Sequence, residues 1–436
     1  MHERTQRAVA RLLFVFCCAV PTSIVLTAIL LTWTSWYQSR KLAEVTYRLG
    51  RETGLVFQID RCRLIAPNTY VLENVRIDDP DSGRNVATIR MVDYFHGTDR
   101  VGIRLHQPEL QSAGLGQAWS KLHDRLISCP AHTVVPIFIR AADLNIQSRT
   151  GSLPLADLWA TITPEGKSVR MIAEAGDAAG GTGPRVRVDL FRDREGAIPA
   201  TELVLSTEGT PLPCSALAEY APAIRKLGPD AEFSGVVKCV ESPDGWSFDL
   251  GTSSLTQMNL SFLTDDFPHR VVGKAELHLR RCLVHPGQTV NMNGVLHASG
   301  VRLKTPLLEA MRERLGMNID DRELLPNANG IECKLAAIHF EITDETMNLT
   351  GICDDFHAGI GSNVALYARG RPIAWTRASR IDTEQVTAVL DPPSRTLAAW
   401  NQVFLPSSPV VSPSERPLGE IRRVKNWTGQ DTIRQE

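Results

Sequence analysis

The stretch AELHLR, residues 275–280, decides the fold class of this chain, because apolar and polar residues alternate along it. Successive side chains of a β-strand point to opposite faces of the sheet. Leu277 and Leu279 would therefore lie on one face, with Glu276 and His278 on the other. One apolar and one polar face per strand predict an antiparallel sheet with one side in contact with water.

The same alternation recurs along the chain, in residues 101–106, 186–190, 246–250 and 338–343. Segments rich in Pro and Gly, such as DPDSG at 79–83, separate these stretches, as tight reversals require. We therefore predict a mainly β fold, built as a long antiparallel meander. Helical periodicity is confined to a few short stretches, which are residues 42–49, 115–127, 215–227 and 305–315.

The N-terminal region is typical of a membrane anchor, since no charged residue occurs from Leu12 to Ser39. About 20 apolar residues suffice to cross a hydrocarbon core of about 30 Å. Interfacial aromatic residues gather at one end, where Trp33, Trp36 and Tyr37 stand. An uncleaved helix is favoured over a signal peptide, whose apolar core is shorter. Basic residues on both flanks leave the orientation of the span open.

The pattern divides the chain into successive segments. We predict a cytoplasmic N-terminus at 1–11, a transmembrane helix at 12–37, a juxtamembrane helix at 38–52, a first β-rich region at 53–210, a second β-rich region with helix-plus-meander units at 211–390, and a largely disordered Pro/Ser-rich tail at 391–436.

Composition and motifs point away from several classes of chemistry. The 436 residues carry a net charge of −2, so no global positive field predicts nucleic-acid binding. The nine cysteines form no CxxC pair, and their disulfide state is left open. His278, Cys282 and His285 would need a fourth ligand to hold zinc, and a strand and turn place them poorly for it. We predict no enzyme, no catalytic residue, no cofactor and no metal.

The segment that follows the apolar stretch carries a resemblance to a known family. It contains Thr53-Gly54-Leu55, a strand at 59–64, the strand YVLENVRI at 70–77 and the polar turn at 79–83. This order resembles the start of AsmA-like proteins, in which a transmembrane helix is followed by a TGL motif and a LENV-type strand. The helix at 115–127 has no counterpart in that pattern. The resemblance implies a bacterial inner-membrane protein with one span and its C-terminal domain in the periplasm.

The resemblance also implies kinship with bridge-like lipid-transfer proteins, in which a long sheet curls into a groove with an apolar inner face. Acyl chains would cover such a face, and each CH₂ removed from water gains about 0.8 kcal/mol. Alternation alone fits a sandwich of two packed sheets as well. The candidate groove residues, which are equally good core residues, are Val186, Val188, Trp246, Phe248, Leu277, Leu279, Phe340 and Ile342.

These observations lead to two expected functions. The first is a non-enzymatic AsmA-like envelope protein that supports lipid or outer-membrane homeostasis by shielding or transferring lipid in a β groove. The alternative is a tethered β-sandwich ectodomain that binds another envelope protein. The expected partners are the membrane itself, phospholipid or another envelope protein.

Overall fold

The structure is a computed structural model, and it describes most of the chain between Leu13 and Val389. The predicted cytoplasmic N-terminus and the predicted C-terminal tail lie outside the described residues. The described residues are 13–32, 34–148, 151–177, 186–194, 199–207, 209–216, 222–242, 245–267, 269–285, 289–324, 330–343, 346–377, 380–382, 385–386 and 389.

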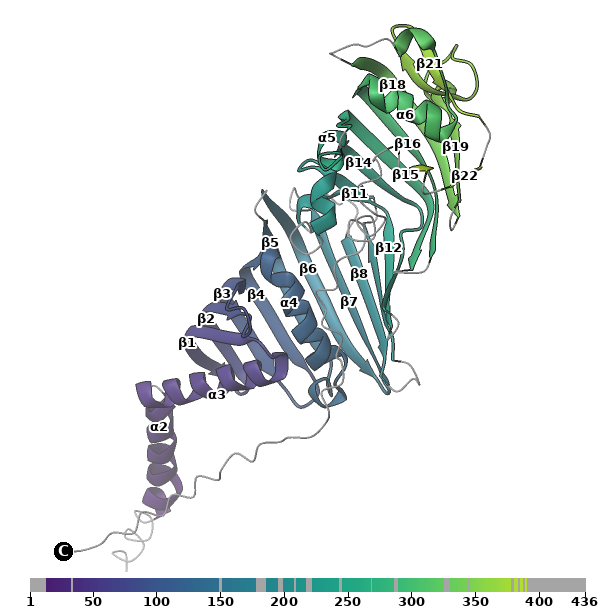
Figure 1. Ribbon diagram of the computed structural model, residues 1–436. Coiled ribbons are helices and arrows are strands. Elements are labelled where there is room, and N and C mark those ends of the chain that lie inside the picture. Colours follow the sequence, from purple (N-terminus) through teal and green to yellow (C-terminus); the bar gives the residue numbers. More distant parts are fainter. Residues whose placement is uncertain are drawn as a thin grey trace, which may run out of the picture.

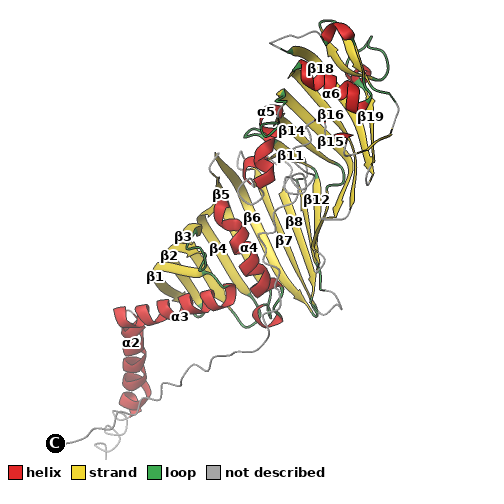
Figure 2. Ribbon diagram, in the orientation of Figure 1, coloured by secondary structure: helices red, strands yellow, loops and turns green. Residues whose placement is uncertain are grey.

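The described strands join one elongated, twisted sheet with helices placed along it (Figures 1 and 2). The expectation of a mainly β chain is therefore confirmed. The strands are β1 (Val56–Ala66), β2 (Thr69–Asp78), β3 (Asn85–His96), β4 (Val101–Gln111), β5 (Ile137–Ser148), β6 (Gly151–Glu165), β7 (Ser168–Asp177), β8 (Val186–Asp193), β9 (Thr201–Ser206), β10 (Leu212–Pro213), β11 (Glu232–Ser234), β12 (Val236–Ser242), β13 (Gly245–Asp249), β14 (Ser253–Asn259), β15 (Val272–His285), β16 (Thr289–Leu303), β17 (Asn318–Ile319), β18 (Ile331–Thr343), β19 (Thr346–Gly351), β20 (Val364–Ala368), β21 (Arg371–Trp375) and β22 (Arg380–Asp382).

Helices and single helical turns connect or cover these strands. They are η1 (Val15–Ala19), α2 (Val20–Thr32), α3 (Ser35–Thr53), α4 (Ser112–Leu122), η2 (His123–Ile127), η3 (Pro130–His132), η4 (Cys214–Ala216), η5 (Pro222–Leu227), α5 (Leu260–Leu263), α6 (Thr305–Leu315), η6 (Asp321–Glu323) and α7 (Cys353–Phe356).

The sheet is mixed rather than wholly antiparallel, which corrects the predicted meander. Strands β1 to β9 pair in chain order, but β4 and β5 run parallel to each other. A parallel pair needs a crossover of a dozen or more residues that returns the chain to the same end of the sheet. The segment that contains α4, η2 and η3 supplies this crossover. The alternation of apolar and polar residues cannot reveal a parallel pair, because a strand alternates in the same way whether its neighbour runs parallel or antiparallel to it.

Beyond β9 the sheet continues through β12, β13, β15, β16 and β18. Strands β11 and β12 form one line interrupted at Gly235, whose φ is +138°. A Cβ atom at Gly235 would lie 2.6 Å from the Cα of Ser253, so a side chain would clash with the neighbouring strand. Thr207 closes the interruption, because its amide donates to the Gly235 carbonyl at 3.0 Å and its hydroxyl accepts from the Gly235 amide at 2.9 Å.

One face of the sheet is apolar along the N-terminal strands. Directly opposed residues of neighbouring strands point to the same face. Cys62 opposes Leu72, Leu72 opposes Val92, and Val92 opposes Leu105. Leu105 then opposes Ala141 across the parallel pair. Register thus carries one apolar face from β1 across to β5.

Buried cysteines belong to this apolar interior and form no disulfide among the described residues. Cys282 and Cys333 are 2% and 0% exposed. Burial raises the pKa of the Cys282 thiol to about 11 and that of Cys333 to about 12. Both therefore remain protonated near neutral pH and pack as small apolar side chains.

The predicted helices are recovered in part. Helix α6 spans Thr305–Leu315, as predicted, and ends at Gly316, whose φ of +63° is the left-handed conformation of a helix C-terminus. The predicted helix at 115–127 is α4 followed by the wider turn η2. The predicted helix at 215–227 is wrong where it is described, because η4 and η5 are 3₁₀ turns. Pro222 lacks the amide hydrogen that a continuous helix would need.

A single helix over residues 12–37 is also not what the structure shows. Helix α2 ends at Thr32 and α3 begins at Ser35. Thr34 adopts an extended conformation, and its hydroxyl accepts from the Tyr37 amide at 3.4 Å, which starts a new helix. Among the described residues, no single helix is both long and apolar enough to cross a membrane.

Candidate functional site

The candidate site is the apolar face of the sheet, which extends from strand to strand. Val188 of β8 opposes Leu205 of β9, and Leu205 opposes Val237 of β12. Val186 lies two residues before Val188, so its side chain is on the same face. Val188 also opposes Ala173 of β7, and the register leads from there through Ala160 of β6 to Ile139 of β5, so the middle of the sheet continues the apolar face of β1 to β5.

The next strands extend this face through β13. Cys239 lies two residues after Val237 and opposes Phe248. Phe248 in turn opposes Val284 of β15. Trp246, two residues before Phe248, stacks against it with ring centroids 6.2 Å apart. The two predicted aromatic residues of β13 are thus on the same face as the two predicted valines of β8.

The remaining candidates follow on β15 and β18. Val284 opposes Val290 of β16, and Gly294 lies four residues further along that strand. Gly294 opposes a residue on each side, namely Leu279 and Phe340. Register therefore brings the other predicted positions onto the same face, and these are Leu277, Leu279, Phe340 and Ile342.

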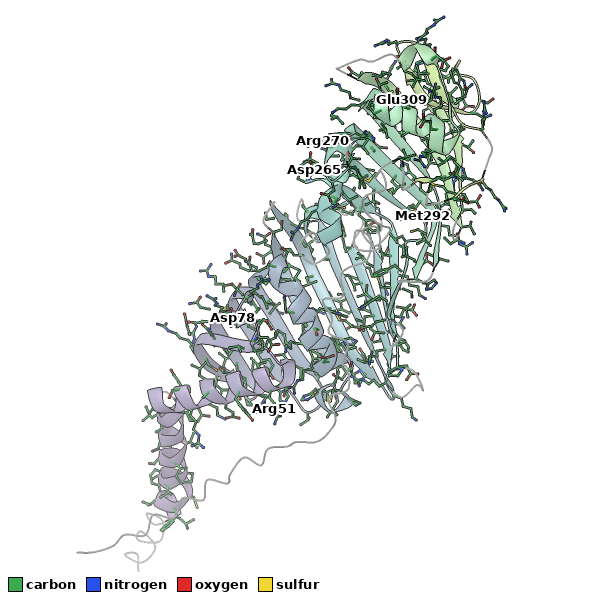
Figure 3. The ribbon with its side chains drawn as sticks, in the orientation of Figure 1. Arg51, Asp78, Asp265, Arg270, Met292 and Glu309 are labelled. Carbon is green, nitrogen blue, oxygen red and sulfur yellow. The ribbon has the colours of Figure 1, made fainter. Side chains whose placement is uncertain are left out.

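Exposure divides these residues into two groups. Leu279 and Phe340 are each 6% exposed and belong to the distal core. The other candidates are only half-buried, and they are Val186, Val188, Trp246, Phe248, Leu277 and Ile342. The middle of the apolar face is accordingly in partial contact with solvent. Met292 of β16, which opposes Ile342, is also half-buried (Figure 3).

Helices, rather than a second sheet, cover parts of the apolar face among the described residues. Helix α3 packs Leu42, Val45 and Leu49 against β1 to β3. Helix α4 and η2 place Trp119 and Ile127 over β6 to β9. Helix α6 covers the distal strands with further leucines. The predicted sandwich is therefore not the arrangement of the described strands, which belong to one sheet.

A polar cluster fastens η2 to the sheet. The hydroxyl of Thr201 accepts from Arg192 and lies 2.8 Å from Nε2 of His123, to which it can donate. Glu241 approaches the same Nε2 at 3.7 Å. Burial lowers the pKa of Arg192. Polar groups on an apolar face are costly unless they are hydrogen-bonded, so the cluster fixes where η2 sits.

Arg194 adds a second fastening point. Its guanidinium donates to the carbonyl of Ile127 at 2.8 Å and to that of Leu126 at 2.9 Å. These carbonyls end η2 and have no partner further along the helix. Neither Arg194 nor the cluster was predicted. The sequence nevertheless contained a signal for the cluster. Arg192 continues the alternation of Val186, Val188 and Leu190, so it stands at a position where an apolar residue is expected.

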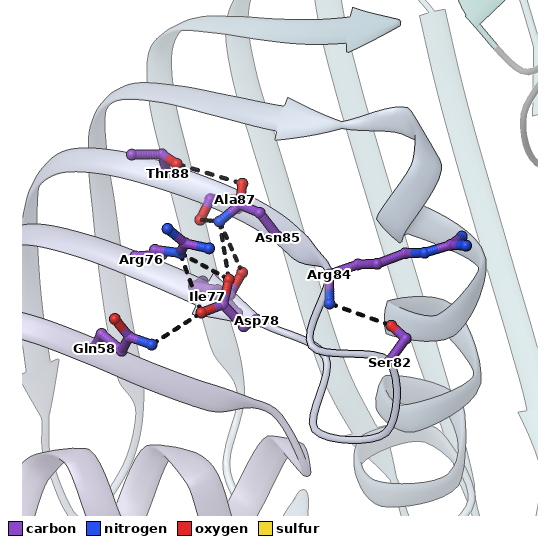
Figure 4. A network of polar contacts seen from close by, with 9 residues as sticks. All are labelled: Gln58, Arg76, Ile77, Asp78, Ser82, Arg84, Asn85, Ala87 and Thr88. Atoms are coloured by element: carbon purple, nitrogen blue, oxygen red, sulfur yellow. Dashed lines mark hydrogen bonds and ion pairs between the residues drawn. The ribbon is translucent and has the colours of Figure 1, made fainter.

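The N-terminal strands hold a different polar network, centred on Asp78 (Figure 4). Asp78 is 6% exposed and accepts hydrogen bonds from Gln58, Arg76 and Asn85 at 3.1, 2.9 and 3.2 Å. Neighbouring Asp79 accepts from the amide and hydroxyl of Ser82 at 2.8 and 2.6 Å. These bonds close the predicted turn at 79–83, so the network has a structural role.

Two further features do not form a site of the same kind. A recess of about 470 Å³ opens at β4 to β6, and its lining is mixed: Arg104, Leu105, His106, Arg140, Ala141, Ala142, Asp157, Leu158 and Trp159. Within the part of the chain that the structure describes, no three His, Cys, Asp or Glu side chains are grouped to hold a metal ion. The half-buried apolar face therefore remains the candidate functional site.

Comparisons of this chain with protein-family models, curated proteins and solved structures gave no match.

Proposed function

We propose that this protein is a membrane-anchored, non-enzymatic, AsmA-like envelope protein whose apolar sheet face shields or transfers lipid. The observation that carries the proposal is the half-buried apolar zone over β8, β9, β12 and β13. Its residues are opposed in register, and no described sheet packs on them. An extended apolar face of this kind marks a binding surface more often than a plain exterior.

The chemistry of that zone favours acyl chains as the occupant. Its central positions, such as Val188, Leu205 and Val237, carry no hydrogen-bonding group, and the polar cluster at Arg192 lies beside them at the edge of the zone. A flexible hydrocarbon chain can follow a twisted face of this shape. Each CH₂ that leaves water gains about 0.8 kcal/mol, so one two-tailed lipid would gain many kcal/mol before ordering costs.

The proposed anchor is the N-terminal helical segment. Residues 13–32 are helical throughout, as α-helix interrupted by the wider turn η1, and span about 30 Å at about 1.5 Å per residue. Large apolar side chains stand exposed along it, including Phe14 at 64%, Phe16 at 65%, Ile24 at 62% and Leu30 at 62%. A length close to that of the hydrocarbon core and an apolar surface support insertion in a bilayer.

The proposed location rests on the resemblance to AsmA-like proteins. It places the anchor in the bacterial inner membrane, the segment before it in the cytoplasm and the sheet in the periplasm. A sheet that begins next to the anchor and extends away from it (Figure 1) could carry lipid from the bilayer toward the other side of the envelope.

Site-specific photo-crosslinking tests the proposal with two matched positions. The photoreactive p-benzoylphenylalanine replaces either Phe248, on the apolar face, or Phe191, which is 40% exposed on the opposite face. The full chain is produced in bacterial cells and irradiated there, and adducts are identified by mass spectrometry. Lipid adducts at position 248 and none at position 191 are expected.

Two outcomes would contradict the proposal. Equal lipid labelling at both positions would show that contact is nonspecific. A stoichiometric protein adduct at position 248 without lipid would replace lipid shielding with the tethered interaction function.

A further inference from the structure

Helix α3 has one face on the sheet and one face of exposed side chains. Its inward face is formed by Leu42, Val45 and Leu49, which pack into the core of β1 to β3. Its outward face carries Arg40, Ala43, Tyr47 and Arg51, all of them exposed. These four residues are spaced by three or four positions, so they form one stripe along the helix.

The charge of α3 is unevenly balanced. Glu44 is held within the helix by Lys41 at 2.8 Å and by Arg48 at 3.2 Å. Arg51, near the C-terminal end of α3 (Figure 3), has no ion pair among the described residues. Four basic residues face two acidic ones over Ser35–Thr53, so the helix carries a net positive charge.

Tyr47 gives the outward face an amphipathic anchor. It is 71% exposed in the middle of the stripe, between two arginines. A tyrosine ring with an apolar body and a polar tip is favoured at a membrane–water interface. Arginine stems lie along apolar surface while their guanidinium groups reach phosphate. The outward face thus combines basic side chains with one interfacial aromatic residue, which suits contact with lipid headgroups.

The arrangement of α2 and α3 determines where the outward face of α3 would lie relative to a membrane. The two helices meet at Thr34 and form an L, with α3 lying across the end of α2 (Figure 1). A helix that crosses the end of a membrane-inserted helix runs along the membrane surface.

We infer that the outward face of α3 lies flat on the membrane and binds the phosphate groups of anionic phospholipids through Arg40 and Arg51. This inference rests on the proposed anchor. It sets the orientation of the whole sheet, because α3 is packed rigidly on β1 to β3. Each basic residue near an anionic surface contributes roughly a fivefold gain in surface partitioning.

The test uses the full chain, with p-benzoylphenylalanine in place of Tyr47, reconstituted in vesicles. One set of vesicles contains phosphatidylcholine alone, and the other also contains phosphatidylglycerol. Lipid adducts at position 47 are expected in both sets of vesicles. In the mixed vesicles, the fraction of adducts formed with phosphatidylglycerol should exceed the fraction of phosphatidylglycerol in the bilayer. The double variant Arg40→Glu/Arg51→Glu should lose that preference. The matched variant Arg104→Glu/Arg140→Glu, with the same charge change on exposed arginines of β4 and β5, should keep it.

Two further measurements separate the possible failures. Protection of the β1 to β3 amides from hydrogen exchange reports that each variant is folded. Resistance to alkaline carbonate extraction reports that α2 is inserted. A chain that resists extraction yet gives no lipid adduct at position 47, or gives one without preference for phosphatidylglycerol, overturns the inference and leaves the anchor intact. A chain that carbonate extracts overturns the anchor and the inference with it.

Discussion

The middle and the distal end of the sheet use the same sequence pattern and reach different states of burial. In the middle, Val188, Leu205 and Val237 oppose one another and remain half-buried. At the distal end, Leu279 and Phe340 lie on the same face and are each only 6% exposed. Both regions alternate apolar and polar residues, so alternation sets which face is apolar but does not set what covers it.

The difference comes from how the chain returns. In the distal region, α6 lies over the apolar face, and side chains of β17, β20 and β21 pack into the same core. In the middle, α4 and η2 cover one part of the face. The half-buried part is where the proposed lipid would lie.

The largest contrast should come from placing the same charge in each region. Val364→Glu would bury an unpaired carboxylate in the distal cluster of Leu335, Ala337 and Cys353 and destabilise that region by about 3–5 kcal/mol. Val188→Glu should cost about 1 kcal/mol or less, because water reaches the side chain. Native-state hydrogen exchange of the amides in β20 and β8 measures both. Severe destabilisation by Val188→Glu would show that the middle face is covered.

A second contrast removes volume instead of adding charge. Leu308 of α6 is 0% exposed, so Leu308→Ala should leave a cavity and cost about 2–5 kcal/mol. Leu205→Ala, at a half-buried position, should cost about 1 kcal/mol. Thermal unfolding of the detergent-solubilised chain, followed with hydrogen exchange of the same strands, gives both values. Equal costs would remove the distinction between the regions.

The packing of η2 on the middle of the sheet can be weakened without a change in the distal region. Arg194→Ala removes two charge-assisted bonds to η2 and should weaken the docking of η2 by about 1.5–3 kcal/mol. Hydrogen exchange of the amides at 123–128 should then accelerate while distal amides remain unchanged. Arg170→Ala is the control, since its ion pair with Asp189 is exposed to solvent and should contribute little to stability. Unchanged exchange at η2 would rule out this fastening role.

The smallest effect concerns the N-terminal strands and depends on pH. Burial acts to raise the pKa of Asp79, but hydrogen bonds from the Ser82 hydroxyl and amide outweigh it and hold the pKa below its usual value of 3.8. The ionised Asp79 carboxylate therefore contributes its full stabilisation of the fold above about pH 4. This contribution is lost as the pH falls through the pKa of Asp79 in the folded state.

Asp79→Asn should consequently cost about 1 kcal/mol or less at neutral pH, and its difference from the parent chain should vanish in acid. Unfolding followed by exchange of the β2 and β3 amides across this pH range measures it. A difference that stays constant with pH would show that the carboxylate charge is not involved.

Local sequence signals decided a definite part of this protein. The alternation at 275–280 and its counterparts determined the strands and the residues that share the apolar face. The helical periodicity at 305–315 located α6 correctly, and the turn at 79–83 formed as predicted. These features depend on residues a few positions apart, so a local pattern is sufficient to specify them.

Only the tertiary structure decided the features that depend on distant residues. The parallel pairing of β4 and β5, the break between α2 and α3 at Thr34, and the fastening of η2 by Arg194 were not predicted. The division of the apolar face into a half-buried middle and an enclosed distal end belongs to the same class. An alternating strand has one apolar face by itself, whereas the cover of that face is set by where the chain returns, and no local pattern records that return.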